Sequence, residues 1–86
     1  MGVKENLIAA KALIDTPDKW AAYPSIHRAV DLTAPDKDQR EDALMALQCK
    51  LPREWPRKLF GFDVDRPHAD VMALFDRAIA AADEVA

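Results

Sequence analysis

The most regular hydrophobic pattern lies in the last quarter of the chain. Apolar residues recur there at steps of three and four, the spacing that places them on one face of an α-helix. These positions are Val71, Leu74, Phe75, Ala78, Ile79, Ala82 and Val85. The pattern predicts an amphipathic helix over about 66–85, with Asp65 as its cap and Pro67 in its first turn. This helix should pack onto the rest of the protein.

Two earlier stretches have the same spacing. The first predicts a helix over about 3–15 that ends before Pro17, with an apolar stripe made of Val3, Leu7, Ala10 and Ile14, and Leu13 beside it. The second predicts a helix over about 36–51 that Pro52 closes, with a stripe made of Ala43, Leu44, Leu47 and Leu51. Asp36 followed by Gln39 has the form of a capping box for this second helix.

Shorter helical pieces are expected between these two stretches. Thr16 and Pro17 have the form of an N-cap and a first helical position, which predicts a piece at 17–22. The spacing of Ile26, Ala29 and Val30 predicts another at 25–32. Strand alternation and repeats are absent from the sequence. We therefore expect one all-α domain over 1–86, a compact small bundle of three main helices and two short pieces.

Composition limits the classes of function. The 86 residues carry a net charge of −3, which argues against a general nucleic-acid binder. A signal segment and a long apolar run are both missing, so we expect a cytoplasmic protein without a membrane span. The single Cys49 cannot form an internal disulfide, and we expect it to be a buried small hydrophobe.

Catalytic, cofactor and metal motifs are also missing. The two histidines, His27 and His68, have no paired spacing with other ligand types, and His68 is expected to face solvent or bond the preceding loop. The carboxylates Asp63, Asp65 and Asp70 stand where a helix start needs acceptors. The sequence therefore predicts a protein that is not an enzyme and that binds neither a cofactor nor a metal.

The segment 50–66 departs from the overall charge because it mixes aromatic and basic residues. Its candidate protein-binding residues are Arg53, Trp55, Arg57, Lys58 and Phe60. The same rings could instead anchor the long connection in the core, with the aliphatic parts of the Lys and Arg side chains lying over them. Stacking on nucleic-acid bases is a third interpretation.

Alanines widen the apolar faces of the first and last helices. These flanking residues are Ala9, Ala12, Ala73, Ala80 and Ala81. Such a widened face suits either a tight contact between helices or the seam of a homodimer, and both interpretations stay open.

Residues 62–79 read FDVDRPHADVMALFDRAI. This segment resembles the C-terminal end of an uncharacterised family of small bacterial and phage proteins. That family typically carries Trp-Asn-Asp, then Arg-Thr-His-Ala-(Asp or Glu)-Val, then a helix ending in Leu-Phe-Asp-Arg-Ala. Here Phe62-Asp63-Val64 stands in place of Trp-Asn-Asp, and Pro67 replaces the threonine. The Ala-rich stretch from Leu7 to Trp20 is loosely similar too. The resemblance implies a fold fragment and a bacterial or phage origin, and no activity.

Size and elimination favour a function in binding another protein. A small acidic protein without catalytic groups acts by occupying a surface, as an inhibitor, an adaptor or an assembly factor. The alternative is a nucleic-acid-binding regulator that uses the basic and aromatic segment 50–66, and it predicts affinity that falls steeply with salt.

Overall fold

The computed structural model describes residues 2–22, 25–34, 36–53, 55, 61–62 and 66–85, without the side chains of 84 and 85. Its helices are α1 (Val3–Leu13), α2 (Pro17–Ala22), α3 (Ile26–Thr33), α4 (Lys37–Gln48) and α6 (His68–Val85). None of the described residues forms a strand. The radius of gyration of 11.7 Å is close to the value of about 12 Å expected for a compact chain of this length. The predicted all-α bundle is therefore confirmed.

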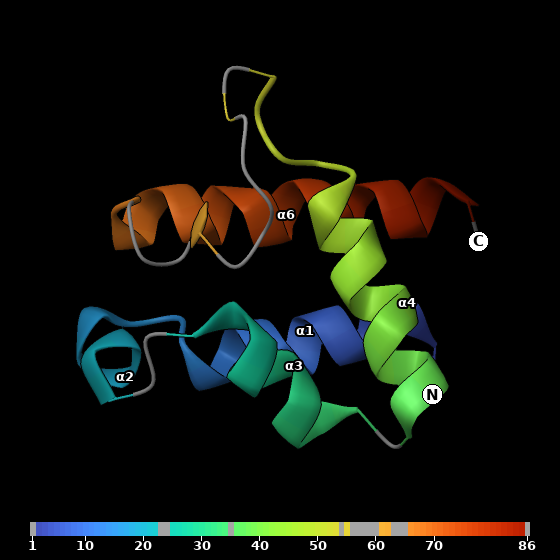
Figure 1. Ribbon diagram of the computed structural model, residues 1–86, viewed down its shortest axis with the longest axis horizontal. Helices are drawn as coiled ribbons and strands as arrows, with labels where there is room; N and C mark the ends of the chain where they lie inside the picture. Colours follow the sequence, from blue (N-terminus) through green and yellow to red (C-terminus); the bar gives the residue numbers. More distant parts are fainter. Residues whose placement is uncertain are drawn as a thin grey trace.

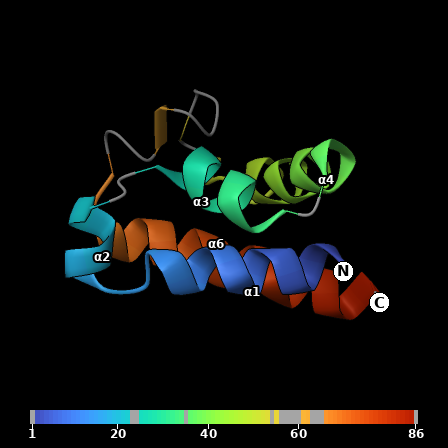
Figure 2. The same cartoon turned by 90° about the horizontal axis from the view of Figure 1, so that it is seen from below.

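The helices form two layers. Helices α1 and α6 lie side by side in one layer, and α3 and α4 form the other layer, as Figures 1 and 2 show from two directions. Helix α4 crosses the α1 and α6 pair at a steep angle (Figure 1) and contacts both helices. Helix α1 contacts α3, α4 and α6, so it is the element around which the others are arranged.

Two ion pairs mark the antiparallel register of α1 and α6. Lys4 bonds Asp83 and Lys11 bonds Asp76, each at 2.6 Å between Nζ and Oδ1. The hydrogen bond to Asp83, together with that carboxylate's charge, raises the pKa of Lys4. Exposed pairs of this kind contribute little stability. The energy that holds α1 against α6 must therefore come from the apolar interface beneath them.

The core lies between the two layers. Its buried members are Leu7, Ala10, Ile14, Ile26, Ala29, Val30, Ala43, Leu47, Phe62, Val71, Leu74, Phe75 and Ala78. The predicted stripes supply nearly all of them, because a helix that buries one face must bury the residues at spacings of three and four. Leu44, Leu51 and Ile79 lie at the edge of the core and are half-buried.

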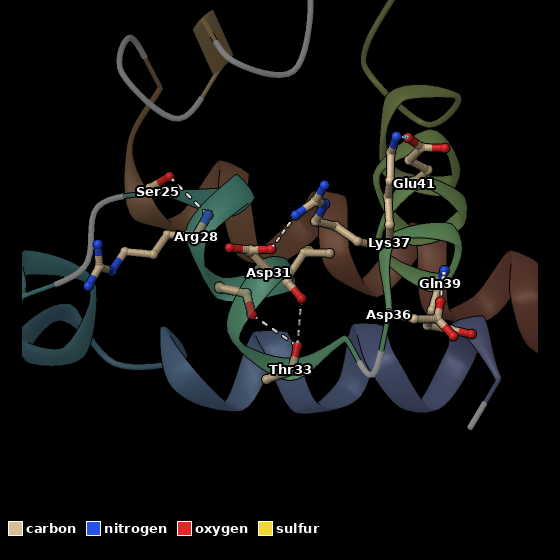
Figure 3. A network of polar contacts seen from close by, with 11 residues as sticks. Ser25, Arg28, Asp31, Thr33, Asp36, Lys37, Gln39 and Glu41 are labelled. Atoms are coloured by element: carbon tan, nitrogen blue, oxygen red, sulfur yellow. Dashed lines mark hydrogen bonds and ion pairs between the residues drawn. The ribbon is translucent and has the colours of Figure 1, made fainter.

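Side chains cap three helices near their starts. Thr16 Oγ1 accepts from the Lys19 amide at 3.2 Å, as the sequence predicts. Ser25 accepts from the Arg28 amide, and Asp36 accepts from the Gln39 amide at 2.8 Å (Figure 3). These bonds satisfy amides that have no partner within their own helix. The predicted cap Asp65 lies outside the described residues.

The helix ends differ from the predicted ones by a few residues. Helix α1 ends at Leu13 instead of residue 15, but Ile14 still reaches the core as the capping residue. Helix α4 ends at Gln48 instead of residue 51 because the chain tightens: the amides of Lys50 and Leu51 bond carbonyls three residues back. Helix α6 begins at His68, two residues later than expected.

One side-chain expectation was wrong, and one histidine makes a contact that the sequence did not predict. Cys49 is exposed, because it follows the last residue of α4 on the side turned away from the core. His68 is half-buried: its Nε2 donates to the carbonyl of Ile14 at 2.6 Å, and its ring lies 5.9 Å from that of Trp20. The beginning of α6 is thus joined to the end of α1 by a contact between residues 54 positions apart.

The buried Asn6 is a polar contact that the hydrophobic pattern did not predict. Its Nδ2 donates to Thr33 Oγ1 at 2.8 Å, and Thr33 in turn bonds the carbonyls of Ala29 and Val30 (Figure 3). This contact links α1 to the last turn of α3. The Nδ2 half of the buried amide thus has a partner that aligns the two helices, whereas its buried Oδ1 accepts no hydrogen bond from the described residues.

We expect Phe75→Ala to lower the free energy of unfolding by about 3–5 kcal/mol, because it empties space at a fully buried position of α6. A loss of this size is a large fraction of the stability of a small domain. Urea unfolding followed by circular dichroism measures it. Leu32→Ala is the control, since Leu32 is 60% exposed and its truncation should change stability by less than about 0.5 kcal/mol. Equal effects of the two substitutions would contradict the core described above.

Candidate functional site

The predicted binding segment is only partly described. Arg53 is exposed and Trp55 is half-buried, whereas Arg57, Lys58 and Phe60 lie outside the described residues. The Trp55 ring meets that of the buried Phe62 edge-on at 5.4 Å between centroids. The Arg66 guanidinium lies 5.2 Å from the centroid of the Trp55 ring. The structure thus brings Trp55, Phe62 and Arg66 together as a packed group at the edge of the core.

The basic side chains near this group are engaged with the protein itself. Arg66 contacts the carboxylate of Asp70 at 3.7 Å, and Arg77 Nε donates to the carbonyl of Lys50 at 3.4 Å. All of these groups except Lys50 line one small pocket of about 160 Å³. Asp70 offsets part of the positive charge that Arg66 and Arg77 bring to this pocket.

A larger groove lies where α4 crosses the ends of α1 and α6. It measures about 620 Å³ and is open to solvent. Its walls come from the beginning of α1, one face of α4 and the last turns of α6. The lining residues are Gly2, Val3, Lys4, Glu5, Asp42, Met45, Ala46, Cys49, Lys50, Ala78, Ala81 and Ala82. We call this feature the α4 groove.

Helix α4 has two apolar faces, and only one of them serves the core. Ala43 and Leu47 are buried against the other helices. Met45, Ala46 and Cys49 follow the same helical spacing on the groove side, where Met45 is 61% exposed. Met45 and Cys49 are exposed there, whereas Ala46 is half-buried and also packs against the core. Surfaces of this kind mark sites of interaction with other proteins.

Charged residues of both signs border the α4 groove. Asp42 lies on α4 and Lys50 lies two residues beyond its end, and both are exposed. On the α1 side the border is made by Lys4, which is paired with Asp83, and by Glu5. An apolar centre with a polar rim is the usual anatomy of a protein interface.

A second cleft, between α3 and α4, has different chemistry. It measures about 630 Å³ and includes Asp31, Arg40 and Glu41 among its lining residues. Arg40 bonds Asp31 at 2.6 Å, which raises the pKa of Arg40, and Glu41 contacts Lys37 at 3.9 Å (Figure 3). These charges are paired across or along the helices, so the cleft is explained as an electrostatic contact between α3 and α4.

The sequence pattern did not single out the α4 groove. The spacing of Met45, Ala46 and Cys49 is visible in the sequence, but the pattern predicts a buried Cys49 and places Met45 on no predicted stripe. Of the flanking alanines considered as a dimer seam, Ala81 lines the groove, whereas Ala12 and Ala80 are exposed elsewhere. A second set of apolar positions on α4 is the sequence feature from which this surface could be predicted.

No family model matches this chain, and comparisons with curated proteins and with solved structures also gave no match. The resemblance of residues 62–79 to a family of small bacterial and phage proteins therefore stays a prediction. In the described part of the chain, no group of three or more His, Cys, Asp or Glu side chains lies close enough together to hold a metal ion. Likewise, no described helix combines the length and the apolar character that crossing a membrane requires.

We expect Cys49 to react with one equivalent of a small thiol reagent in the native state, because its side chain is exposed on the groove. Absorbance with a chromogenic disulfide reagent measures the rate with and without urea. A thiol that reacts only after unfolding would contradict the position described for Cys49.

Truncation of Phe62 and of Trp55 should show how much each ring contributes to the stability of the core. Phe62→Ala should cost about 3–5 kcal/mol, since Phe62 is fully buried, and Trp55→Ala about 1–3 kcal/mol, since Trp55 is half-buried. Urea unfolding of both variants measures the difference. A Trp55→Ala variant as stable as the unaltered protein would show that Trp55 adds nothing to the core.

Proposed function

We propose that this chain is a non-enzymatic protein-interaction module that binds a polypeptide partner in the α4 groove. The observation that carries the proposal is the second apolar face of α4, on which Met45 is exposed at the open side of the groove. Burial of this face would remove apolar surface from water, which is the main favourable contribution to association.

The composition of the groove suits a helix as its ligand. Alanines at positions 46, 78, 81 and 82 line it, and their small side chains allow another backbone to come close. The flexible Met45 can adapt to the side chains of a partner. An amphipathic helix that lays its apolar face into a groove is a recurrent mode of peptide recognition.

The predicted segment around Arg53 is consistent with this location. Arg53 follows Lys50, a residue of the groove rim, by three positions and is exposed. The segment 50–66 therefore begins on the groove rim, with Lys50. The contribution of Arg57, Lys58 and Phe60 stays a prediction, as does nucleic-acid binding through this segment.

Capture from a bacterial lysate with three forms of the tagged chain tests the proposal. The source follows from the bacterial or phage origin that the resemblance implies. Met45→Glu places a charge on the groove, and Leu32→Glu places the same charge on α3, at a side chain of matched exposure (61% and 60%). Both forms should fold normally, which circular dichroism checks.

We expect the unaltered chain and the Leu32→Glu form to retain a partner protein after nuclease treatment. The Met45→Glu form should retain at least about tenfold less of that protein. That loss corresponds to the removal of one central contact of an interface. Quantitative mass spectrometry measures the ratio. Equal retention by all three forms would contradict the groove as the binding surface, and recovery that disappears with nuclease would favour the nucleic-acid alternative.

A further inference from the structure

The charges on the groove side of α4 are separated along the helix. Asp42, in its N-terminal half, lines the groove, and so does Lys50, two residues beyond its C-terminal end; both are exposed. Met45, Ala46 and Cys49 stand between the acidic and basic ends. A partner that matches this face must present a basic end to Asp42, an apolar middle to Met45, and an acidic end to Lys50.

A second α4 helix has this arrangement when it runs in the opposite direction. In an interface with two-fold symmetry, the same patch of both subunits meets itself, so each contact occurs twice. With the symmetry axis near Ala46, Asp42 faces the partner's Lys50, and Lys50 faces the partner's Asp42. The two-fold symmetry makes the second pair the copy of the first, so both pairs form in one register.

The apolar residues fit the same geometry. Ala46 lies nearest the axis, where a small side chain lets two helices cross closely. Met45, one residue away, points to the groove side and is the large exposed side chain available to fill the partner's groove of about 620 Å³. The ends of α1 and α6 would flank the incoming helix.

We propose that the α4 groove holds the α4 helix of a second copy of this chain, which makes the protein an antiparallel homodimer. The inference rests on the proposed function, because it takes the same groove and names its partner. Charge complementarity distinguishes it from a partner of uniform sign, which would gain at one end of the groove and lose at the other.

The size of the molecule sets the strength that we expect. A standard interface covers about 800 Å² on each partner, roughly a seventh of the 5282 Å² that this chain exposes. An interface made mainly by one helix face is expected at the small end of the interface size range. Association should therefore be in the micromolar range and should weaken with added salt, because two ion pairs border it.

Charge reversal tests the pairing directly. Sedimentation velocity of the full chain over a range of concentrations should show a dimer that Asp42→Lys or Lys50→Glu alone weakens at least about tenfold. A mixture of the two variants should recover heterodimers, because each new charge then meets an opposite one. The double variant should recover its own homodimer for the same reason.

Glu41→Lys is the matched control, since it makes the same charge change one residue away, in the cleft between α3 and α4. This variant should dimerise as the unaltered chain does. The proposal is overturned if the unaltered chain stays monomeric to about 1 mM, if Glu41→Lys weakens the dimer as much as Asp42→Lys, or if the mixture stays monomeric.

A crosslink tests the position of the axis. Ala46→Cys in a Cys49→Ser background should form a disulfide-linked dimer under mild oxidation, because the two Ala46 Cα atoms would lie within bonding range. Ala80→Cys in the same background is the control on an exposed flank of α6. Faster crosslinking through position 80 would overturn the proposed interface in favour of the alanine flanks.

The inference and the proposed function can fail separately. A monomeric chain whose captured partner is lost with Met45→Glu would overturn the dimer and support the proposed function. If Met45→Glu changes neither dimerisation nor the capture of a partner, the dimer and the proposed function are both overturned.

Discussion

The rest of the structure depends on the burial of the apolar face of α6 against α1. The two helices run antiparallel, with Val71, Leu74, Phe75 and Ala78 packed on residues such as Leu7 and Ala10. Without that pair, neither α3 nor α4 would have a surface to cover, because α1 contacts both of them. The ion pairs that border the interface set the register and add little energy, since all four side chains are at least partly exposed.

Two polar contacts give this apolar core a particular arrangement. Asn6 bonds Thr33 and aligns α1 with α3, and His68 bonds the carbonyl of Ile14 and joins the beginning of α6 to the end of α1. Apolar contacts are tolerant of small shifts, whereas a buried donor loses its bond if its partner moves. A chain of 86 residues has a small core, and such contacts favour one packing arrangement of it.

Helix α4 connects the fold to the proposed function. One of its faces completes the core through Ala43 and Leu47, and the other carries Met45 to the surface of a groove. A helix that is apolar on two sides has only one side covered in the isolated chain. Its charges, acidic toward the beginning and basic beyond the end, are what an antiparallel copy of itself would complement. The same helix therefore serves both the stability of the monomer and the proposed association.

The sequence alone determined the helical class, the positions of the helices to within a few residues, and most of the core. The spacing of residues such as Leu7, Ala29, Leu47 and Leu74 is dictated by helix geometry, so it can be read without a structure. Cap residues such as Thr16 and Asp36 act on amides three positions away, and they too are local. The sequence did not determine the site, because exposure depends on which helices cross. Cys49 and Met45 are apolar residues near a buried stripe, and only the steep crossing of α4 over α1 and α6 left them outside the core. His68 and Asn6 found partners 54 and 27 positions away, and contacts over such separations are decided by tertiary packing.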